Sequence, residues 1–208
     1  MKYRLGYLVA KRTLDICVSL VSMVLLTPIF AIIALIILKD KTTSKIIYSQ
    51  ERVGLHGRRF KIYKFQSMVD NADVILKKDN ELYHKFVSNG YKLPTDEDPR
   101  ITRIGAFLRK TSLDELPQFW NTLNGSMSII GPRPVVEEEL VEYGNQVDKF
   151  LSAKPGIFGL WQASGRSNIE YPERAELELS YIDRANLRLD FYIMFRTIIA
   201  IFKRDGAF

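Results

Sequence analysis

An apolar run covers residues 16–38, which contain no charged side chain. As a straight helix, a run of this length would reach across a hydrocarbon core of about 30 Å. Thr27 and Pro28 lie at its middle, and a proline there removes a helix hydrogen bond and bends the chain. The pattern therefore predicts a membrane segment made of a helix, a break and a second helix.

Basic residues flank this segment on both sides, which bears on its orientation. They are Lys2, Arg4, Lys11 and Arg12 before the run, and Lys39, Lys41 and Lys45 after it. The positive-inside rule favours the cytoplasmic side for both flanks, which a single crossing does not satisfy. We therefore expect a re-entrant segment that returns to the same face. A kinked ordinary span is the alternative, because transmembrane helices tolerate proline.

Two segments rich in β-branched and aromatic residues, 46–53 and 59–65, predict a β-hairpin with a glycine-containing connection. The hairpin region carries many cations, which either line a phosphate pocket or face anionic headgroups. These cations are Arg52, Arg58, Arg59, Lys61 and Lys64.

The remaining pattern is mainly helical. Residues 70–89 predict a polar helix, and the acidic, proline-containing loop at 94–99 interrupts the periodicity. A short helix is expected over 104–109. The last helix, 187–204, has one strongly apolar face, which either packs on the core or lies in the membrane interface.

Composition and charge exclude several classes of protein. With 47% hydrophobic and 26% charged residues, the chain of 208 residues is neither disordered nor fibrous. Cys17 is the only cysteine, so disulfides are excluded, and two histidines leave little room for a zinc site. Residues 1–64 hold 12 Lys or Arg against 3 Asp or Glu. This basic front end is more typical of a membrane-surface protein than of a nucleic-acid binder.

The segment 111–125 carries the strongest candidate chemistry. Pro117 lies in or near a first helical turn, so a helix is expected to start close to Asp114. In one interpretation, Ser112 and Glu115 form a capping box. In the other, adjacent carboxylates divide two tasks, one holding a divalent cation and the other attacking phosphorus.

Phosphate-binding residues would then lie nearby. Arg109 precedes the pair, and Arg133 sits between two prolines in a stiff loop suited to a guanidinium–phosphate contact. An ordinary loop salt bridge is the alternative for Arg133. Arg166 lies in a glycine-rich stretch that is either a ligand loop or a tight turn. Asp190, near the start of the last helix, is available as a cap or as a ligand.

Several motifs together resemble one known family. They are Lys11, Arg12 and Asp15, KIYKFQSM (61–68), DPRITRIGAFLRKTSLDELPQFWN (98–121), MSIIGPRP (127–134), KPGIFGLWQASGR (154–166) and LRLDFYIMFRT (187–197). With the proline-centred apolar run, they cover nearly the whole chain. The sequence thus resembles the bacterial sugar transferases, the monotopic phosphoglycosyl transferases that start undecaprenyl-linked glycan assembly.

The resemblance implies transfer of a sugar 1-phosphate from a UDP-sugar to undecaprenyl phosphate, with release of UMP. It implies that Asp114 is the nucleophile of a covalent aspartyl-phosphosugar intermediate and that Glu115, with Asp114, holds Mg²⁺. Arg109 and Arg133 match phosphate-binding arginines. Further polar positions of the active-site face are matched by Lys64, Arg166 and Asp190.

The expected fold is α+β, helix-rich and membrane-associated. Residues 1–38 would form a basic leader and re-entrant membrane helix, and residues 39–208 a compact cytoplasmic catalytic domain with a short β-hairpin. The resemblance implies the minimal catalytic form of the family, on the cytoplasmic face of the bacterial inner membrane. Expected partners are the UDP-sugar, undecaprenyl phosphate, membrane lipid and a second copy in a homodimer, without nucleic acid.

The chain departs from the family pattern at Ser126, where an acid is usual. If that acid supports the metal, Mg²⁺ affinity is weaker here, and if it caps the turn, serine does the same. Two other functions stay open. One is a non-catalytic, lipid-binding scaffold of a glycan-assembly complex. The other is a phosphohydrolase that uses the same two carboxylates, Asp114 and Glu115.

Overall fold

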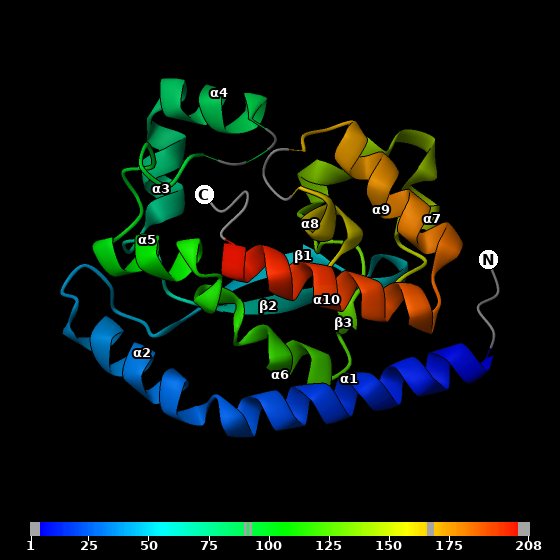
Figure 1. The fold of residues 1–208 in the computed structure, drawn as a ribbon. Coiled ribbons are helices and arrows are strands. Elements are labelled where there is room, and N and C mark those ends of the chain that lie inside the picture. Colours follow the sequence, from blue (N-terminus) through cyan, green and yellow to red (C-terminus); the bar gives the residue numbers. More distant parts are fainter. Residues whose placement is uncertain (1–4, 90, 92, 166–168, 204–208) are drawn as a thin grey trace.

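The fold begins with a bent pair of helices that lies along the base of the molecule (Figure 1). The computed structural model describes residues 5–89, 91, 93–165 and 169–203. Helix α1 (Leu5–Leu25) and helix α2 (Thr27–Lys39) meet at an angle of 60°. The Thr27 hydroxyl donates to the Met23 carbonyl at 2.8 Å, and Pro28 lies in the first turn of α2, where its missing N–H is tolerated. The predicted break at Thr27 and Pro28 is confirmed.

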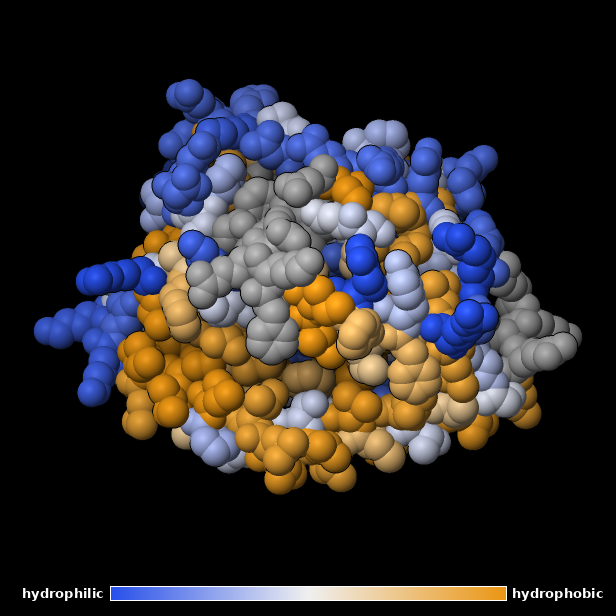
Figure 2. All heavy atoms as spheres, viewed as in Figure 1, coloured by the Kyte–Doolittle hydropathy of each residue, from blue (hydrophilic) through white to orange (hydrophobic). Residues whose placement is uncertain are grey.

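The bent pair is the part of the structure with membrane-like length and composition. No single helix within the described ranges is long and apolar enough to cross a membrane, but α1 and α2 together are. Large exposed apolar side chains follow both helices, including Leu20, Val24, Ile32, Leu35 and Leu38. Figure 2 shows hydrophobic residues gathered over this edge of the molecule. Whether the pair is re-entrant or spanning stays a prediction.

The predicted hairpin is confirmed. Strands β1 (Ile47–Val53) and β2 (Arg59–Phe65) pair antiparallel, with Gln50 opposite Ile62. A single 3₁₀ turn, η1 (Leu55–Gly57), lies in their connection. On β2, Ile62 is buried in the main core, whereas Phe65 is buried with Ile33, Ile37 and Leu108, so the hairpin packs against both clusters.

A second, parallel pair of short strands forms the centre of the core. Strand β3 (Ser128–Ile130) pairs with β4 (Gly156–Phe158), although the two are far apart in sequence. The chains approach so closely that a Cβ on Gly156 would lie 2.1 Å from the Gly131 nitrogen. Glycine is therefore required there.

The predicted helix over 70–89 is wrong as a single element. It is two helices, α3 (Ala72–Lys78) and α4 (Asn80–Ser88), because Asp79 between them is extended and its side chain caps α4 by accepting the Leu82 N–H at 3.0 Å. The short helix predicted at 104–109 is confirmed as α5 (Arg103–Lys110), capped by Thr102.

The remaining helices complete the body. They are η2 (Leu113–Glu115), α6 (Gln118–Leu123), η3 (Glu137–Gln146), α7 (Val147–Phe150), α8 (Leu160–Ser164), α9 (Glu173–Arg184) and α10 (Leu187–Lys203). Of these, α6 and α10 contact β3. Helix α10 crosses in front of the strands in Figure 1. It buries Ile193 and Thr197 against the body and leaves Phe191 and Phe195 exposed. The helix-rich α+β class is thus confirmed.

Polar contacts attach α1 to the rest of the body. The Arg12 guanidinium donates to the carbonyls of Thr122 and Leu123, at 2.6 and 2.8 Å, and so satisfies the end of α6. The Asp15 carboxylate accepts from the Ser128 hydroxyl and the Ile129 N–H at the start of β3. These motif residues hold the membrane-like helix pair against the core. The predicted domain division at residues 38 and 39 stays a prediction.

Candidate active site

Asp114 and Glu115, called the dyad below, lie in the short turn η2, between α5 and α6. Asp114 is buried, with 6% of its surface exposed. Ser112, just before the turn, is in the left-handed region (φ 57°) and makes no side-chain capping hydrogen bond. Helix α6 begins at Gln118, directly after Pro117, and also has no side-chain cap. The missing cap at Ser112 counts against the capping-box interpretation.

Lys64 brings the two carboxylates to one point. Its Nζ, on strand β2, lies 2.9 Å from Glu115 Oε1 and 3.9 Å from Asp114 Oδ2. The Arg133 Nη1 atom lies 4.0 Å from the same Glu115 oxygen. Of the hairpin cations, Lys64 is thus the one that reaches the acidic pair, whereas Arg59 ion-pairs with Glu51 and Glu137 on the outer surface.

Burial raises the pKa of Asp114 to about 6. Lys64 acts against this shift by lowering the pKa, the negative charge of Glu115 raises it, and Arg109 and Arg133 lower it. At neutral pH the side chain is mainly a carboxylate in a poorly hydrated position. Such a group is a better nucleophile than an exposed aspartate.

Arg109 lies in the last turn of α5, beside the dyad. Its Nε donates to the Ser67 hydroxyl at 3.1 Å, which orients the guanidinium. Burial lowers the pKa of Arg109, with the charge of Asp114 acting against the shift. A guanidinium nevertheless stays protonated at neutral pH. The side chain therefore places a fixed positive charge in the field of Asp114.

Arg133 is held at three points. Its main-chain N–H donates to Glu178 Oε2 at 2.8 Å, its guanidinium lies over the Trp161 ring at 5.5 Å, and its Nη1 approaches Glu115. Arg174 also lies over Trp161, at 4.7 Å, and 3.8 Å from Glu178. The loop salt bridge expected as an alternative for Arg133 exists, but its partner is the dyad itself.

Sequence reasoning missed Glu178 and Arg174. Both are fully buried on α9, side by side at a spacing of one helical turn. The available signal was their position on the apolar face of that helix, together with Ala175, Leu179 and Ile182. Buried charges need partners. Here Glu178 pairs with Arg174 and also accepts from the Arg133 N–H, which supports the Arg133 loop.

Asp190 is placed among α1 and α9 side chains. It accepts hydrogen bonds from Tyr7 (3.0 Å), Lys11 (2.8 Å) and Tyr181 (2.8 Å). The structure thus places Asp190 at the contact between α1 and the rest of the body. Its predicted contact with substrate stays a prediction. Arg166 lies outside the described residues.

The donor set of the dyad fits Mg²⁺. Within the described ranges, no group of three or more His, Cys, Asp or Glu side chains could hold a metal. Mg²⁺ is usually bound by one or two carboxylates, with water and substrate phosphates as its other ligands. The Lys64 ammonium shows that Asp114 and Glu115 face a common cation. They therefore fit a Mg²⁺ ion that arrives with a phosphate substrate.

Ser126 closes the turn after α6. Its hydroxyl and its N–H both donate to Asn124 Oδ1, at 2.8 and 3.0 Å. Asn121 donates to the Ser126 hydroxyl at 3.3 Å and also bonds the backbone of β2 at Lys61 and Tyr63. These contacts favour the turn-capping interpretation of this position over the metal-supporting one.

The fold and site define a class of protein: a compact α+β domain with an acidic dyad whose Asp114 is buried, flanking arginines and an apolar helix pair. The model of the family described as "Bacterial sugar transferase" matches residues 6–204, and the chain belongs to this family.

Curated relatives agree. The chain is 45% identical over 201 residues to the UDP-galactose-lipid carrier transferase of Erwinia amylovora, covering 95% of this chain and 41% of that protein. It is 41% identical to the undecaprenyl-phosphate galactose phosphotransferase of Salmonella typhimurium, with the same two coverages. It is 37% identical to the exopolysaccharide production protein ExoY of Sinorhizobium fredii, covering 96% of this chain and 88% of that one. The chain therefore spans about two fifths of the first two relatives and most of the third.

Proposed function

We propose that this chain transfers a sugar 1-phosphate from a UDP-sugar to undecaprenyl phosphate, in the first membrane step of surface glycan assembly. The observation that carries the proposal is the buried Asp114 carboxylate, with Lys64 and Glu115 beside it and two arginines around it. The relatives support the substrate classes, because the Erwinia amylovora protein is named for UDP-galactose and a lipid carrier and the Salmonella typhimurium protein for undecaprenyl phosphate.

In the first step, an Asp114 oxygen attacks the phosphorus that carries the sugar. A bond forms between aspartate and phosphorus, the bond to the bridging oxygen breaks, and UMP leaves with the electron pair. In the second step, a phosphate oxygen of the lipid attacks the same phosphorus. The bond to Asp114 then breaks, which regenerates the carboxylate and yields the lipid diphosphate sugar.

The surrounding residues lower the barrier by screening charge. A carboxylate approaching a diphosphate meets strong repulsion, and Arg109 and Arg133 supply positive charge that is positioned before substrate arrives. Lys64 keeps Glu115 and Asp114 directed to one point. Asp114 and Glu115 would hold Mg²⁺, which when bound supplies further neutralisation of the diphosphate. Because Asp114 carries the sugar phosphate between the two steps, a soluble donor and a lipid acceptor can use one site in turn.

The location we propose is the cytoplasmic face of the bacterial inner membrane. The exposed apolar side chains of α1 and α2 support a membrane-inserted, re-entrant pair, and the contacts of Arg12 and Asp15 couple that pair to the catalytic body. The dyad would then face the lipid phosphate near headgroup height.

The test measures UMP release by the detergent-solubilised full chain with a panel of UDP-sugars, Mg²⁺ and undecaprenyl phosphate. We expect lipid-dependent turnover with one donor, and without lipid at most one UMP per chain. Intact-protein mass spectrometry without lipid should then show an added sugar phosphate. Asp114→Asn should abolish both signals, whereas the matched control Asp183→Asn, at a surface ion pair with Lys149, should keep them.

Each other outcome rejects the proposal. Repeated UMP release without lipid would assign the chain as a hydrolase. No UMP from any donor, in a folded preparation, would favour the scaffold. Unchanged activity of Asp114→Asn would remove Asp114 from the chemistry.

A further inference from the structure

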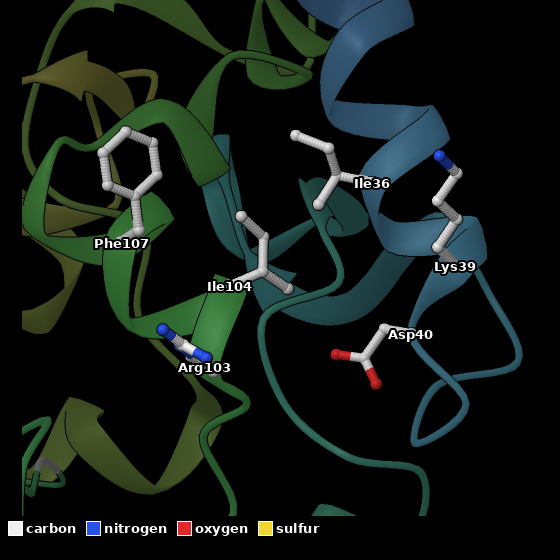
Figure 3. Close-up of a pocket in the computed structure, with 6 residues that line it drawn as sticks. All are labelled: Ile36, Lys39, Asp40, Arg103, Ile104 and Phe107. Carbon is white, nitrogen blue, oxygen red and sulfur yellow. The ribbon is translucent and has the colours of Figure 1, made fainter.

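A cavity of about 450 Å³ lies between the end of α2 and the start of α5, and none of its lining residues belongs to the dyad site. It is lined by Ile36, Lys39, Asp40, Arg103, Ile104 and Phe107. Figure 3 shows Lys39 on α2 and Arg103 on α5 at opposite sides, with Ile36 and Ile104 between them. The cavity thus combines an apolar centre with a positive charge at each side.

The lining of this cavity holds two cations, Lys39 and Arg103, against one acid, Asp40, so its formal charge is positive. The Asp40 Oδ1 atom accepts from the Thr42 N–H and hydroxyl, at 2.9 and 2.6 Å, which holds this side chain in a local turn. Among the ion pairs of the described residues, none includes Lys39 or Arg103, and both side chains are exposed. Arg103 is also the first residue of α5, where the helix dipole adds positive potential. An anion is therefore favoured at this position.

The apolar part of the cavity continues into the outer face of the helix pair. Ile36 is 43% exposed and Phe107 55% exposed, and their neighbours Ile32 and Leu35 on α2 are exposed as well. A free phosphate would use the cations and leave these side chains in water. An amphiphile with an anionic head and an alkyl chain would cover both.

We propose that this cavity binds an anionic membrane phospholipid, with its phosphate between Lys39 and Arg103 and an acyl chain along Ile36 and Phe107. The bound lipid would join the end of α2 to α5 and so fix the depth of the helix pair relative to the catalytic body.

The position argues against the acceptor lipid as occupant. Arg103 and Arg109 are six positions apart on α5, which is about 9 Å along the axis and about 120° around it. A phosphate held at Arg103 therefore lies on a different face of α5 from the arginine beside Asp114. The inference concerns lipid binding alone and does not depend on the proposed transferase activity.

The experiment uses the full chain in nanodiscs that contain phosphatidylglycerol and phosphatidylcholine. The protein is released from the nanodiscs under conditions that preserve bound lipid, and native mass spectrometry measures the lipid retained per chain. Lys39→Gln with Arg103→Gln is compared with Lys41→Gln with Lys110→Gln. The control pair removes the same charge from exposed positions on the same two segments. A third variant, Ile36→Trp, fills the cavity and keeps every charge. Circular dichroism confirms that each variant is folded.

We expect one retained phosphatidylglycerol per chain, reduced at least tenfold by Lys39→Gln with Arg103→Gln and by Ile36→Trp, and less than threefold by the control pair. Equal losses in both charge pairs would reduce the effect to general surface attraction and overturn the proposal. Retention in Ile36→Trp would do the same.

Two further arms separate the sources of phosphate. With undecaprenyl phosphate added to the nanodiscs, phosphatidylglycerol should remain the retained lipid, and its replacement in the wild type would overturn the assignment to a phospholipid. Excess inorganic phosphate should not displace the lipid. Displacement would show a simple anion site.

Discussion

The main-chain N–H of Arg133 donates to the buried Glu178 carboxylate at 2.8 Å, so a residue of α9 holds the loop that presents Arg133 to Glu115. Glu178 in turn faces Arg174, which is also fully buried. The position of the Arg133 loop next to the dyad thus depends on a buried ion pair on α9.

Glu178→Ala should destabilise the fold by about 3 kcal/mol, because it leaves Arg174 with less compensating charge and removes the acceptor of the Arg133 N–H. Glu178→Gln keeps an acceptor oxygen and should cost less. If the loop positions Arg133 for the donor diphosphate, Glu178→Gln should raise KM for the UDP-sugar more than it lowers kcat. Denaturant unfolding and steady-state kinetics measure these effects. An unchanged KM in a folded Glu178→Ala variant would contradict the positioning role.

The pH dependence of the first step should follow Asp114. Its pKa is raised to about 6, so the nucleophilic carboxylate forms as the pH rises through that value. We expect the single-turnover rate of UMP release to rise about tenfold per pH unit below 6 and to level off above 7. The measurement is a rapid-quench pH profile with lipid absent. A rate that is flat between pH 5 and 7 would exclude the ionisation of Asp114 from the first step.

The same shift predicts that the nucleophile costs stability. The folded-state pKa of Asp114 is above its unfolded value of 3.8, so folding favours the protonated form. Stability from this group is then full below pH 4 and is lost as the pH rises towards 6. Asp114→Asn should therefore be more stable than the wild type at pH 7.5, by about 2 kcal/mol, with the difference shrinking towards pH 4. Thermal unfolding in EDTA at both pH values tests this, and a less stable variant at pH 7.5 would contradict it.

Local patterns predicted the elements that depend on local chemistry. Thr27 and Pro28 break the helix for reasons contained in those two residues, and the β-branched and aromatic content of the hairpin segments, with the glycine-containing connection, was enough to find β1 and β2. The pairing of β3 with β4 was not predictable, since three-residue strands carry no clear period and their contact joins segments distant in sequence. The split at Asp79 was missed because one capping aspartate outweighed a continuous polar pattern.

The site divided in the same way. The acidic pair and the two arginines could be named from motif resemblance. The approach of both carboxylates to Lys64, however, depends on the packing of β2 against η2. Asp190 shows the limit of motifs, because a recurring polar residue can be retained for an anchor as well as for a ligand.

Asp190→Asn should act mainly on the docking of α1. It removes the charged partner of Lys11 and weakens the bonds from Tyr7 and Tyr181, all at a mostly buried position. We expect a loss of about 2 kcal/mol in stability, faster amide hydrogen exchange in α1, and an unchanged KM for the UDP-sugar. A large rise in KM without a change in exchange would instead support the predicted substrate contact.

Ser126→Asp should stabilise the chain. Gly125, next to Ser126, has Arg12 and Lys154 as its nearest side chains, since a Cβ there would lie 3.5 Å from the Arg12 Nη2 and 3.8 Å from the Lys154 Nζ. Burial and the charge of Arg12 lower the pKa of Lys154 and outweigh the opposing effect of Asp15, so a further negative charge is favoured here. An acid at position 126 would sit beside both and could still accept hydrogen bonds in the turn. We expect a gain of about 0.5 to 1 kcal/mol that falls with added salt, whereas the neutral control Ser126→Asn should show none.

The Mg²⁺ concentration for half-maximal activity of Ser126→Asp should stay the same as for the wild type, because Ser126 serves the turn. A shift of that concentration with Ser126→Asp alone would show that this position supports the metal.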